Sequence, residues 1–176
     1  VKELSGILKS KNKLLSVSTP YLYDPAGAQK GYFVYAWAEI APYIDRLRIM
    51  TYDFSVAKPG PLGPLAWTER TIKYAISVMP ASKVYVGIPG YGRDWVTKVE
   101  GTCPGEVAKV VKVGAKAATF VLRDAAALAQ SYGAIPVYNE AFGEVNFTYN
   151  KVYSGLTAAG LATTCTATRN VWYQDA

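Results

Sequence analysis

Short apolar runs that alternate with helical segments place the strongest constraint on the fold. Three runs rich in Val, Ile and Leu fit β-strands: residues 13–19, 46–52 and 83–88. Between the last two, apolar residues recur at a helical period and precede a proline: Ile72, Ala75, Ile76 and Met79, then Pro80. Strand, helix and strand in this order indicate right-handed βαβ units, and therefore an α/β fold with a parallel sheet.

Three further segments complete this part of the chain. Leu4, Ile7 and Leu8 predict the end of an amphipathic helix over residues 2–10. A loop is expected over 21–33 and a short helix over 35–43. The run Val171–Tyr173 is a candidate fourth strand of the same sheet.

The stretch from Trp95 to Asn170 breaks the alternation. It contains one predicted helix over 119–132, with Thr119 as its N-cap. Two β-like runs follow, at 134–138 and 144–149. We therefore expect a small α+β insertion carried by the parallel sheet.

The composition excludes several kinds of catalytic and metal site. The 176 residues contain no histidine, so a Ser-His-Asp triad, a Cys-His pair and a histidine-ligated metal are impossible within them. The two cysteines are too few for a cysteine-only zinc or iron–sulfur site. No apolar run is long enough to span a membrane, and no signal peptide is visible. Because residue 1 is Val, we expect the chain to be a piece of a longer product.

The charge is basic but dispersed. Nineteen Lys and Arg against thirteen Asp and Glu give a net charge of +6 at pH 7. Such a balance suits an anionic wall polymer, an acidic membrane surface or a nucleic acid. Since the basic residues do not gather into a stripe, nucleic acid is not an expected partner.

Cys103 and Cys165 lie in loop-rich surroundings with Gly, Thr and Pro. The pattern favours a disulfide that staples the insertion, and with it an oxidising compartment. Two unrelated buried thiols are the alternative.

Candidate ligand-binding residues lie where the predicted strands end, because parallel α/β folds bind ligands at the carboxyl ends of their strands. They are Tyr52, Asp53, Tyr91, Arg93 and Trp172. Asp53 could equally cap the following turn. Trp172 could be plain core, or could present its ring to a sugar. The glycine-rich segment 87–93 lacks the Gly-Lys-Ser/Thr ending of a phosphate loop, so a nucleotide site is not expected.

Four ordered motifs carry a resemblance to a known family. Residues 43–53 contain Met-x-Tyr-Asp, and residues 80–93 end in Tyr-Gly-Arg. Residues 146–149 are Asn-Phe-Thr-Tyr, and residues 171–176 are Val-Trp-Tyr-Gln-Asp-Ala. Together these motifs resemble the glycoside hydrolases of family 18, the chitinase and endo-β-N-acetylglucosaminidase group, and most of all its bacterial cell-wall and spore-germination members.

The resemblance implies the second half of a (β/α)8 TIM barrel, strands 5–8, with a small α+β insertion between strands 7 and 8. It divides the chain into a partial barrel at 1–94, the insertion at 95–170 and the last barrel strand at 171–176. The family's Asp-x-x-Asp-x-Asp-x-Glu motif, which carries the catalytic acid, does not occur among the thirteen carboxylates. A whole barrel needs roughly 250 residues, so we expect the motif to lie upstream of this fragment.

The resemblance also implies a role for each site residue. Tyr52 and Asp53 match catalytic residues: Tyr52 would hold the substrate's acetamido group, and Asp53 would bind the sugar. The remaining roles are in substrate binding: Trp172 as a subsite floor, Tyr91 and Arg93 as hydrogen-bond donors, and Met50 as packing beneath the site.

The implied reaction is substrate-assisted, retaining cleavage of β-linked N-acetylglucosamine glycans, either chitin or peptidoglycan. The partners are then 2-acetamido oligosaccharides or polysaccharides, no metal or cofactor is implied, and the location is extracellular or in the cell envelope. The fragment alone is expected to be inactive. The alternative is a non-catalytic, chitinase-like carbohydrate-binding protein.

Overall fold

The structure, a computed structural model, describes residues 1–24, 27 and 34–175 and consists of two compact units. Residues 1–52 and 65–88 form the first unit, and residues 53–64 together with those from 89 onward form the second. The boundary expected after residue 94 falls inside the second unit, as does the loop 53–64. Most of the loop expected over 21–33 lies outside the described residues.

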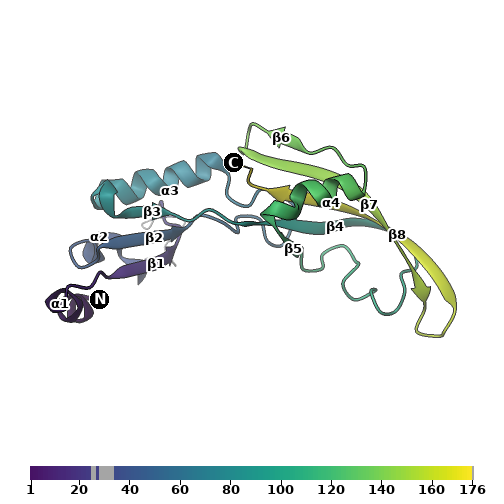
Figure 1. Cartoon of the computed structure of the whole chain (residues 1–176), viewed down its shortest axis with the longest axis horizontal. Helices are drawn as coiled ribbons and strands as arrows, with labels where there is room; N and C mark the ends of the chain where they lie inside the picture. The colour runs from purple at the N-terminus through teal and green to yellow at the C-terminus, as the bar shows by residue number, and fades with distance from the viewer. Residues whose placement is uncertain (25–26, 28–33, 176) are drawn as a thin grey trace. The chain divides into compact units, whose positions relative to one another are not determined.

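The first unit is an α/β layer. Its elements are α1 (Lys2–Ser10), β1 (Ser16–Pro20), α2 (Trp37–Ile40), β2 (Arg46–Met50), α3 (Leu65–Val78), the 3₁₀ turn η2 (Ala81–Lys83) and β3 (Val84–Val86). The strands form a parallel sheet in the order β1-β2-β3 (Figure 1), which confirms the parallel sheet predicted from the alternating pattern. The short helix expected over 35–43 is reduced to the four residues of α2.

The core of the first unit follows from the alternation along β2. Leu47 and Ile49 are fully buried, whereas Arg48 between them is exposed. The buried pair packs with Ala75 of α3, and burial of each large side chain contributes about 1.5–3 kcal/mol. On the side of β1, the Trp37 indole N–H donates to Thr19 Oγ1 at 3.0 Å, so the buried indole keeps a polar partner.

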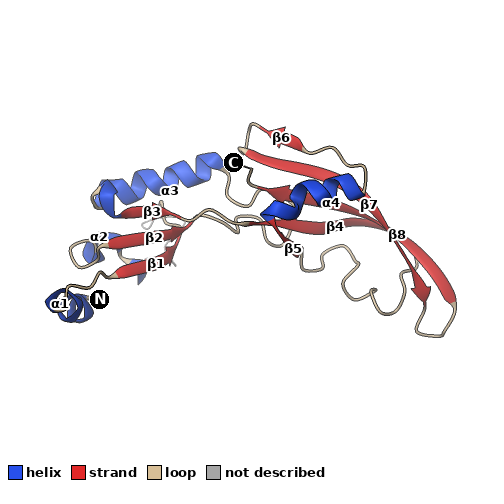
Figure 2. Cartoon of the chain, in the orientation of Figure 1, coloured by secondary structure: helices blue, strands red, loops and turns tan. Residues whose placement is uncertain are grey.

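The second unit is built on an antiparallel sheet (Figure 2). Its elements are β4 (Tyr91–Gly101), β5 (Ala118–Val121), the 3₁₀ turn η3 (Leu122–Asp124), α4 (Ala125–Ser131), β6 (Val137–Asn139), β7 (Glu144–Leu156) and β8 (Ala162–Tyr173). The strand order is β5-β4-β8-β7-β6. Ala125 and Ala129 of α4 pack with the buried face of β7 and β8, which includes Phe147, Val171 and Tyr173.

The helix predicted over 119–132 is wrong at its start. Residues 118–121 form β5, and the helix begins only at Ala125. The run Thr119-Phe120-Val121 consists of β-branched and aromatic residues and pairs with residues 91–93 of β4. This distant partner outweighs the helical spacing of the sequence.

The run 171–173 does not add a fourth strand to the parallel sheet of the described residues. It is the end of β8, which pairs antiparallel with β4 and β7. An apolar run of three residues cannot indicate whether its partner is parallel or antiparallel. The Thr-rich stretch just before it, also a good strand former, continues the same strand and decides the outcome.

A disulfide joins Cys103 to Cys165, as the loop-rich surroundings of the two residues favoured. Cys165 lies on β8 in a small core with Val96, Val111 and Ala167. The bond therefore ties the irregular segment after β4 to the sheet.

Candidate functional site

The candidate site centres on Asp53, which follows the last residues of β2 and is the first residue of the second unit. Its backbone adopts φ +61°, a left-handed conformation that aspartate tolerates better than most residues. Its Oδ1 accepts hydrogen bonds from the Tyr91 hydroxyl at 2.5 Å, from Arg93 Nη2 at 2.6 Å and from Arg93 Nε at 3.1 Å. An aspartate held in a sparsely populated conformation by two partners suits a functional position.

The two partners come from the start of β4 and differ in burial. Arg93 is buried, with its guanidinium carbon 5.7 Å from the centre of the Tyr91 ring. Burial raises the pKa of Tyr91, and the hydrogen bond to Asp53 raises it further, although Arg93 acts in the opposite direction. The phenol therefore stays protonated at neutral pH and acts as a hydrogen-bond donor.

A cavity of about 740 Å³ opens beside this cluster, and every residue that lines it belongs to the second unit. Its lining comprises Asp53, Tyr91, Arg93, Thr119, Phe120, Val121 and Asp124. The Asp53 side chain keeps 39% of its surface exposed, so its carboxylate can also accept hydrogen bonds from a ligand. A carboxylate, a phenol, a guanidinium and an aromatic ring together suit a polyhydroxylated ligand with apolar faces.

Met50 and Tyr52 lie in the first unit, both half-buried. The Tyr52 ring packs closely against Gly87. A Cβ at position 87 would lie 3.0 Å from Tyr52 Cε1 and 2.8 Å from the Ile49 carbonyl oxygen. Only glycine permits this close approach. The Thr51 hydroxyl donates to the Gly87 carbonyl at 2.7 Å and fixes the same contact.

The family model described as glycosyl hydrolases family 18 matches residues 1–168. The chain belongs to this family. It is 25% identical over 151 residues, 85% of its length, to the uncharacterized glycosylase YvbX of Bacillus subtilis, of which it covers 40%. It is 30% identical over 89 residues, 46% of its length, to the cortical fragment-lytic enzyme of the same organism, of which it covers 20%.

Among solved structures, a chitinase from Chromobacterium violaceum matches with a TM-score of 0.73 and 26% identity. The match covers 99% of this chain and 47% of the chitinase. The family 18 chain thus spans less than half the length of the curated relatives it matches.

Trp172 of the family 18 chain is 9% exposed and packs with Leu62, Trp95 and Ala117. Its indole N–H donates to Asn170 Oδ1 at 2.8 Å, and the Phe142 ring approaches it edge-on at 5.7 Å. This burial fits the core alternative that the sequence left open. The role of Trp172 as a subsite floor stays a prediction.

Glu144 is a residue that the sequence analysis missed. It is fully buried, and its two carboxylate oxygens accept the backbone N–H groups of Leu62 at 2.7 Å and Gly63 at 2.6 Å. Burial raises its pKa, while these two bonds and the Gln174 amide act to lower it. Glu144 thereby anchors the loop 53–64 that begins with Asp53. Its partners lie about eighty residues away in the sequence, so no local pattern could have revealed it.

Two kinds of feature are absent from the described residues, 1–24, 27 and 34–175. No cluster of three or more His, Cys, Asp or Glu side chains is placed to hold a metal ion. None of the helices has both the length and the apolar character needed to cross a membrane.

Proposed function

We propose that this chain is part of a glycoside hydrolase that cleaves β-linked glycans containing N-acetylglucosamine, either chitin or peptidoglycan. Membership of family 18 supports the reaction class, and a chitinase and a cortical fragment-lytic enzyme among the similar proteins support the choice of glycan. The observation that carries the proposal is Asp53, held at a strand end by Tyr91 and Arg93 beside a cavity of about 740 Å³.

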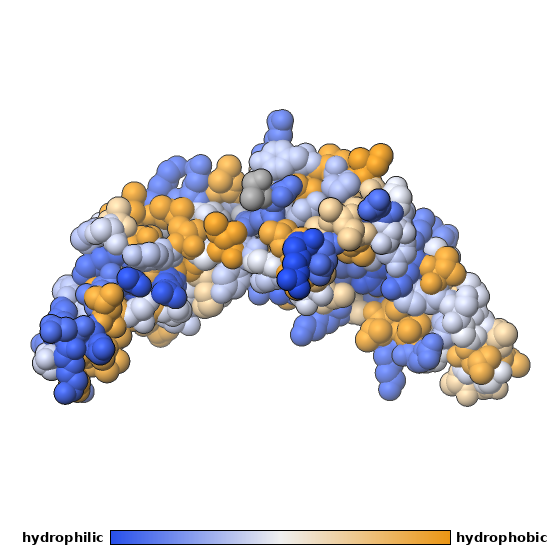
Figure 3. Space-filling view, in the orientation of Figure 1, coloured by the Kyte–Doolittle hydropathy of each residue, from blue (hydrophilic) through white to orange (hydrophobic). Residues whose placement is uncertain are grey.

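In this proposal the first unit supplies barrel strands 5, 6 and 7 of a (β/α)8 barrel, as β1, β2 and β3. Parallel sheets are normally covered on both faces, yet Arg48 of β2 and Tyr85 of β3 are exposed. Apolar side chains also remain at the surface of this unit (Figure 3), including Leu4 and Ile7 of α1. Further strands and helices of a barrel would cover such a face.

The proposed mechanism is substrate-assisted and retaining. The substrate's N-acetyl oxygen attacks the anomeric carbon while a general acid protonates the leaving oxygen, and water then opens the resulting oxazolinium ion. Tyr52 donates a hydrogen bond that orients the acetamido group, and such orientation can lower the barrier by several kcal/mol. Asp53 accepts hydrogen bonds from the sugar, and Arg93 donates to the sugar. The Tyr91 hydroxyl can donate to the sugar where the sugar replaces Asp53 as its acceptor, and Met50 packs beneath the site.

The general acid of this mechanism has to come from another part of the intact protein. The family's Asp-x-x-Asp-x-Asp-x-Glu motif is absent from the 176 residues. Glu144 is buried and its pKa is raised, as in many general acids, but both of its oxygens already accept N–H groups of the loop 53–64. A substrate oxygen cannot reach it without displacing that loop.

A secreted or cell-envelope location belongs to the same proposal. The disulfide between Cys103 and Cys165 supports it, because disulfides persist in oxidising compartments.

Turnover of a soluble N-acetylglucosamine oligomer by the intact protein tests the role of Tyr52. Tyr52→Phe should lower kcat on the order of 100-fold with little change in KM, because the lost hydrogen bond acts mainly in the transition state. Tyr138→Phe, an exposed tyrosine of β6, is the matched control and should leave both constants unchanged. Equal losses in kcat and in substrate affinity would contradict the acetamido role.

The second candidate is a carbohydrate-binding protein that has lost the acid but keeps Asp53, Tyr91 and Arg93 beside the cavity. An intact protein that binds the oligomer but does not cleave it, with another residue at the glutamate position, would establish this alternative.

A further inference from the structure

The segment that follows β4, residues 104–116 (the basic turn), lies against one face of the antiparallel sheet. Val111 is buried there beside Cys165 and Ala167 of β8. Because side chains alternate along a strand, these two residues share a face of β8 with Val171, which packs with α4. The disulfide at Cys165 holds the start of the basic turn on this face.

The candidate site lies on the other face of the sheet. Arg93 of β4 is the register partner of Trp172, which follows Val171 on β8 and so points to the opposite face. Tyr91 is two residues from Arg93 on the same strand and shares its face. The basic turn is therefore separate from the candidate site, and nothing in the proposed mechanism uses it.

The basic turn carries an excess of positive charge. Its sequence contains the lysines Lys109, Lys112 and Lys116 and one acidic residue, Glu106. All three lysines are exposed, and none forms an ion pair with the acidic residues that the structure describes. Exposed cations without partners attract an anionic surface.

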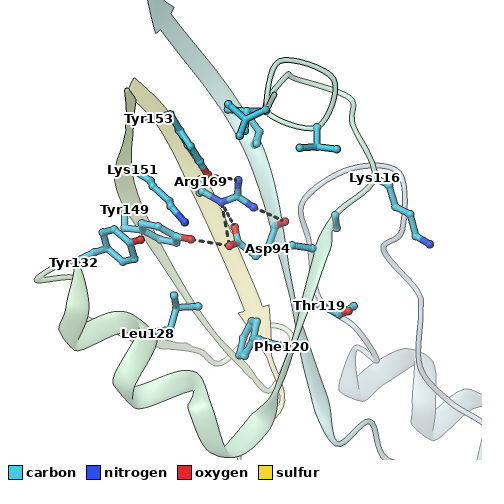
Figure 4. Close-up of a pocket in the computed structure, with 16 residues that line it drawn as sticks. Asp94, Lys116, Thr119, Phe120, Leu128, Tyr132, Tyr149, Lys151, Tyr153 and Arg169 are labelled. Atoms are coloured by element: carbon cyan, nitrogen blue, oxygen red, sulfur yellow. Dashed lines mark hydrogen bonds and ion pairs between the residues drawn. The ribbon is translucent and has the colours of Figure 1, made fainter. Parts of the chain in front are cut away.

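A cavity of about 550 Å³ borders the basic turn and extends this positive surface (Figure 4). Val110 and Lys116 line it from the turn, and Lys151 lines it from β7. Asp94 is the one carboxylate among the described residues that line the cavity, and it forms an ion pair with Arg169 at 2.9 Å. Lys151 therefore adds a further cation. In Figure 4 the amine of Lys116 points away from the cavity, where an external partner can reach it.

Two apolar side chains stand among the lysines of the basic turn. Val110 is 64% exposed and Val113 is 63% exposed. A single exposed valine is ordinary, but two valines interleaved with three lysines make a surface that is both cationic and apolar. An anionic membrane matches both properties, because its headgroups attract lysines and its interface accepts apolar side chains. A dissolved polyanion matches the charge alone.

We propose that the basic turn docks the protein on an anionic lipid membrane. Lys109, Lys112 and Lys116 contact the headgroup phosphates, and Val110 and Val113 enter the interface between them. This inference does not rest on the proposed function, because the basic turn contributes no residue to the cavity beside Asp53.

Sedimentation of the intact protein with lipid vesicles tests this inference. The protein should bind vesicles that contain phosphatidylglycerol, should not bind vesicles of pure phosphatidylcholine, and should be released by high salt. The triple variant Lys109→Gln/Lys112→Gln/Lys116→Gln should lower the partition coefficient on the order of 100-fold, because each lysine near the surface contributes separately. Thermal unfolding followed by circular dichroism shows that each variant is folded.

A matched control removes the same charge from exposed positions in and after α1. The triple variant Lys9→Gln/Lys11→Gln/Lys13→Gln should leave the partition coefficient nearly unchanged. The double variant Val110→Ser/Val113→Ser keeps every lysine and should lower binding to the vesicles about tenfold, because only the apolar contribution is lost. It should bind soluble polyphosphate as well as the wild type does.

The outcomes separate the surface from its partner. No binding to phosphatidylglycerol vesicles, or equal losses in the two lysine variants, would overturn the basic turn as a docking surface. Vesicle binding that the two valine substitutions do not change would overturn insertion into a membrane and leave attraction to any polyanion. Stronger binding to polyphosphate than to the vesicles would overturn the choice of a lipid partner.

Discussion

The two units bury polar groups of different kinds. Among the described residues, the buried Ser and Thr side chains lie in the first unit, at Ser5, Thr19, Thr51 and Thr71. The buried charged side chains among the described residues lie in the second unit, at Arg93, Asp94, Glu144 and Arg169. A buried hydroxyl needs one hydrogen bond, whereas a buried charge needs a specific partner. The first unit can therefore tolerate many sequences of the right pattern, and the second depends on particular long-range pairs.

Opening the disulfide should produce the largest effect and should confine it to the second unit. The bond joins residues separated by 62 positions, for which chain entropy gives a stabilisation of about 4 kcal/mol. Cys103→Ala/Cys165→Ala should lower the hydrogen-exchange protection of β7 and β8 by that free energy and leave β1 and β2 unchanged. Equal loss of protection in both units would show that they unfold as one.

Breaking the buried ion pair should rank next. Asp94→Ala leaves Arg169 buried without a counter-charge and should lower the free energy of unfolding of the second unit by about 3 kcal/mol. The double variant Asp94→Leu/Arg169→Met removes both charges and should recover most of that loss. Urea denaturation of the two variants measures the difference, and a double variant no more stable than the single one would argue against a charge-burial cost.

The same contrast explains what could be predicted from the sequence. The parallel sheet was predictable because Leu47 and Ile49 bury one face of β2 while a regular helix follows, which is local information. The helix expected from Thr119 failed because residues 118–121 find a partner in β4. Secondary structure in the second unit is decided by pairs distant in the sequence, and periodicity does not record them.

The candidate site shows the same division. Asp53, Tyr91 and Arg93 could be named in advance because they follow strand-like runs, and the structure brings these three together. The anchoring of their loop by Glu144 could not be named, since a lone glutamate gives no local sign of its partners. The apolar run that contains Trp172 indicated a strand, but it did not indicate that the Thr-rich residues before it continue the same strand into the antiparallel sheet.

Replacing the loop anchor should have an intermediate effect that depends on pH. Glu144→Gln substitutes an NH2 group for one acceptor oxygen, so one buried N–H of the loop 53–64 loses its partner at a cost of about 2 kcal/mol. Burial raises the folded-state pKa of Glu144 above its unfolded value, although its hydrogen bonds oppose this. Its contribution to stability is therefore complete at pH values below the unfolded pKa and declines as the pH rises through the folded pKa.

Denaturation of the second unit followed from pH 4 to pH 7 checks this sign. The wild type should lose stability relative to Glu144→Gln as the pH rises, so the gap between the two should narrow. Glu140→Gln, an outward-facing change in the turn before β7, serves as the control and should leave the slope of the wild type intact. A gap that widens with pH would mean that the loop's N–H groups lower the pKa of Glu144 more than burial raises it.

The smallest expected effect tests the first unit by itself. Ile49→Val removes one methylene from a fully buried position of β2 and should cost about 1 kcal/mol. Because Ile49 packs with aliphatic neighbours and bears no charged partner, the loss should appear as reduced amide protection in β1 and β2 only. Two results together would establish that the two units unfold independently. In Ile49→Val the protection of β7 and β8 stays unchanged, and in the disulfide variant the protection of β1 and β2 stays unchanged. Reduced protection of the antiparallel sheet in Ile49→Val would instead show that the hydrophobic layer of the first unit supports the charged network of the second.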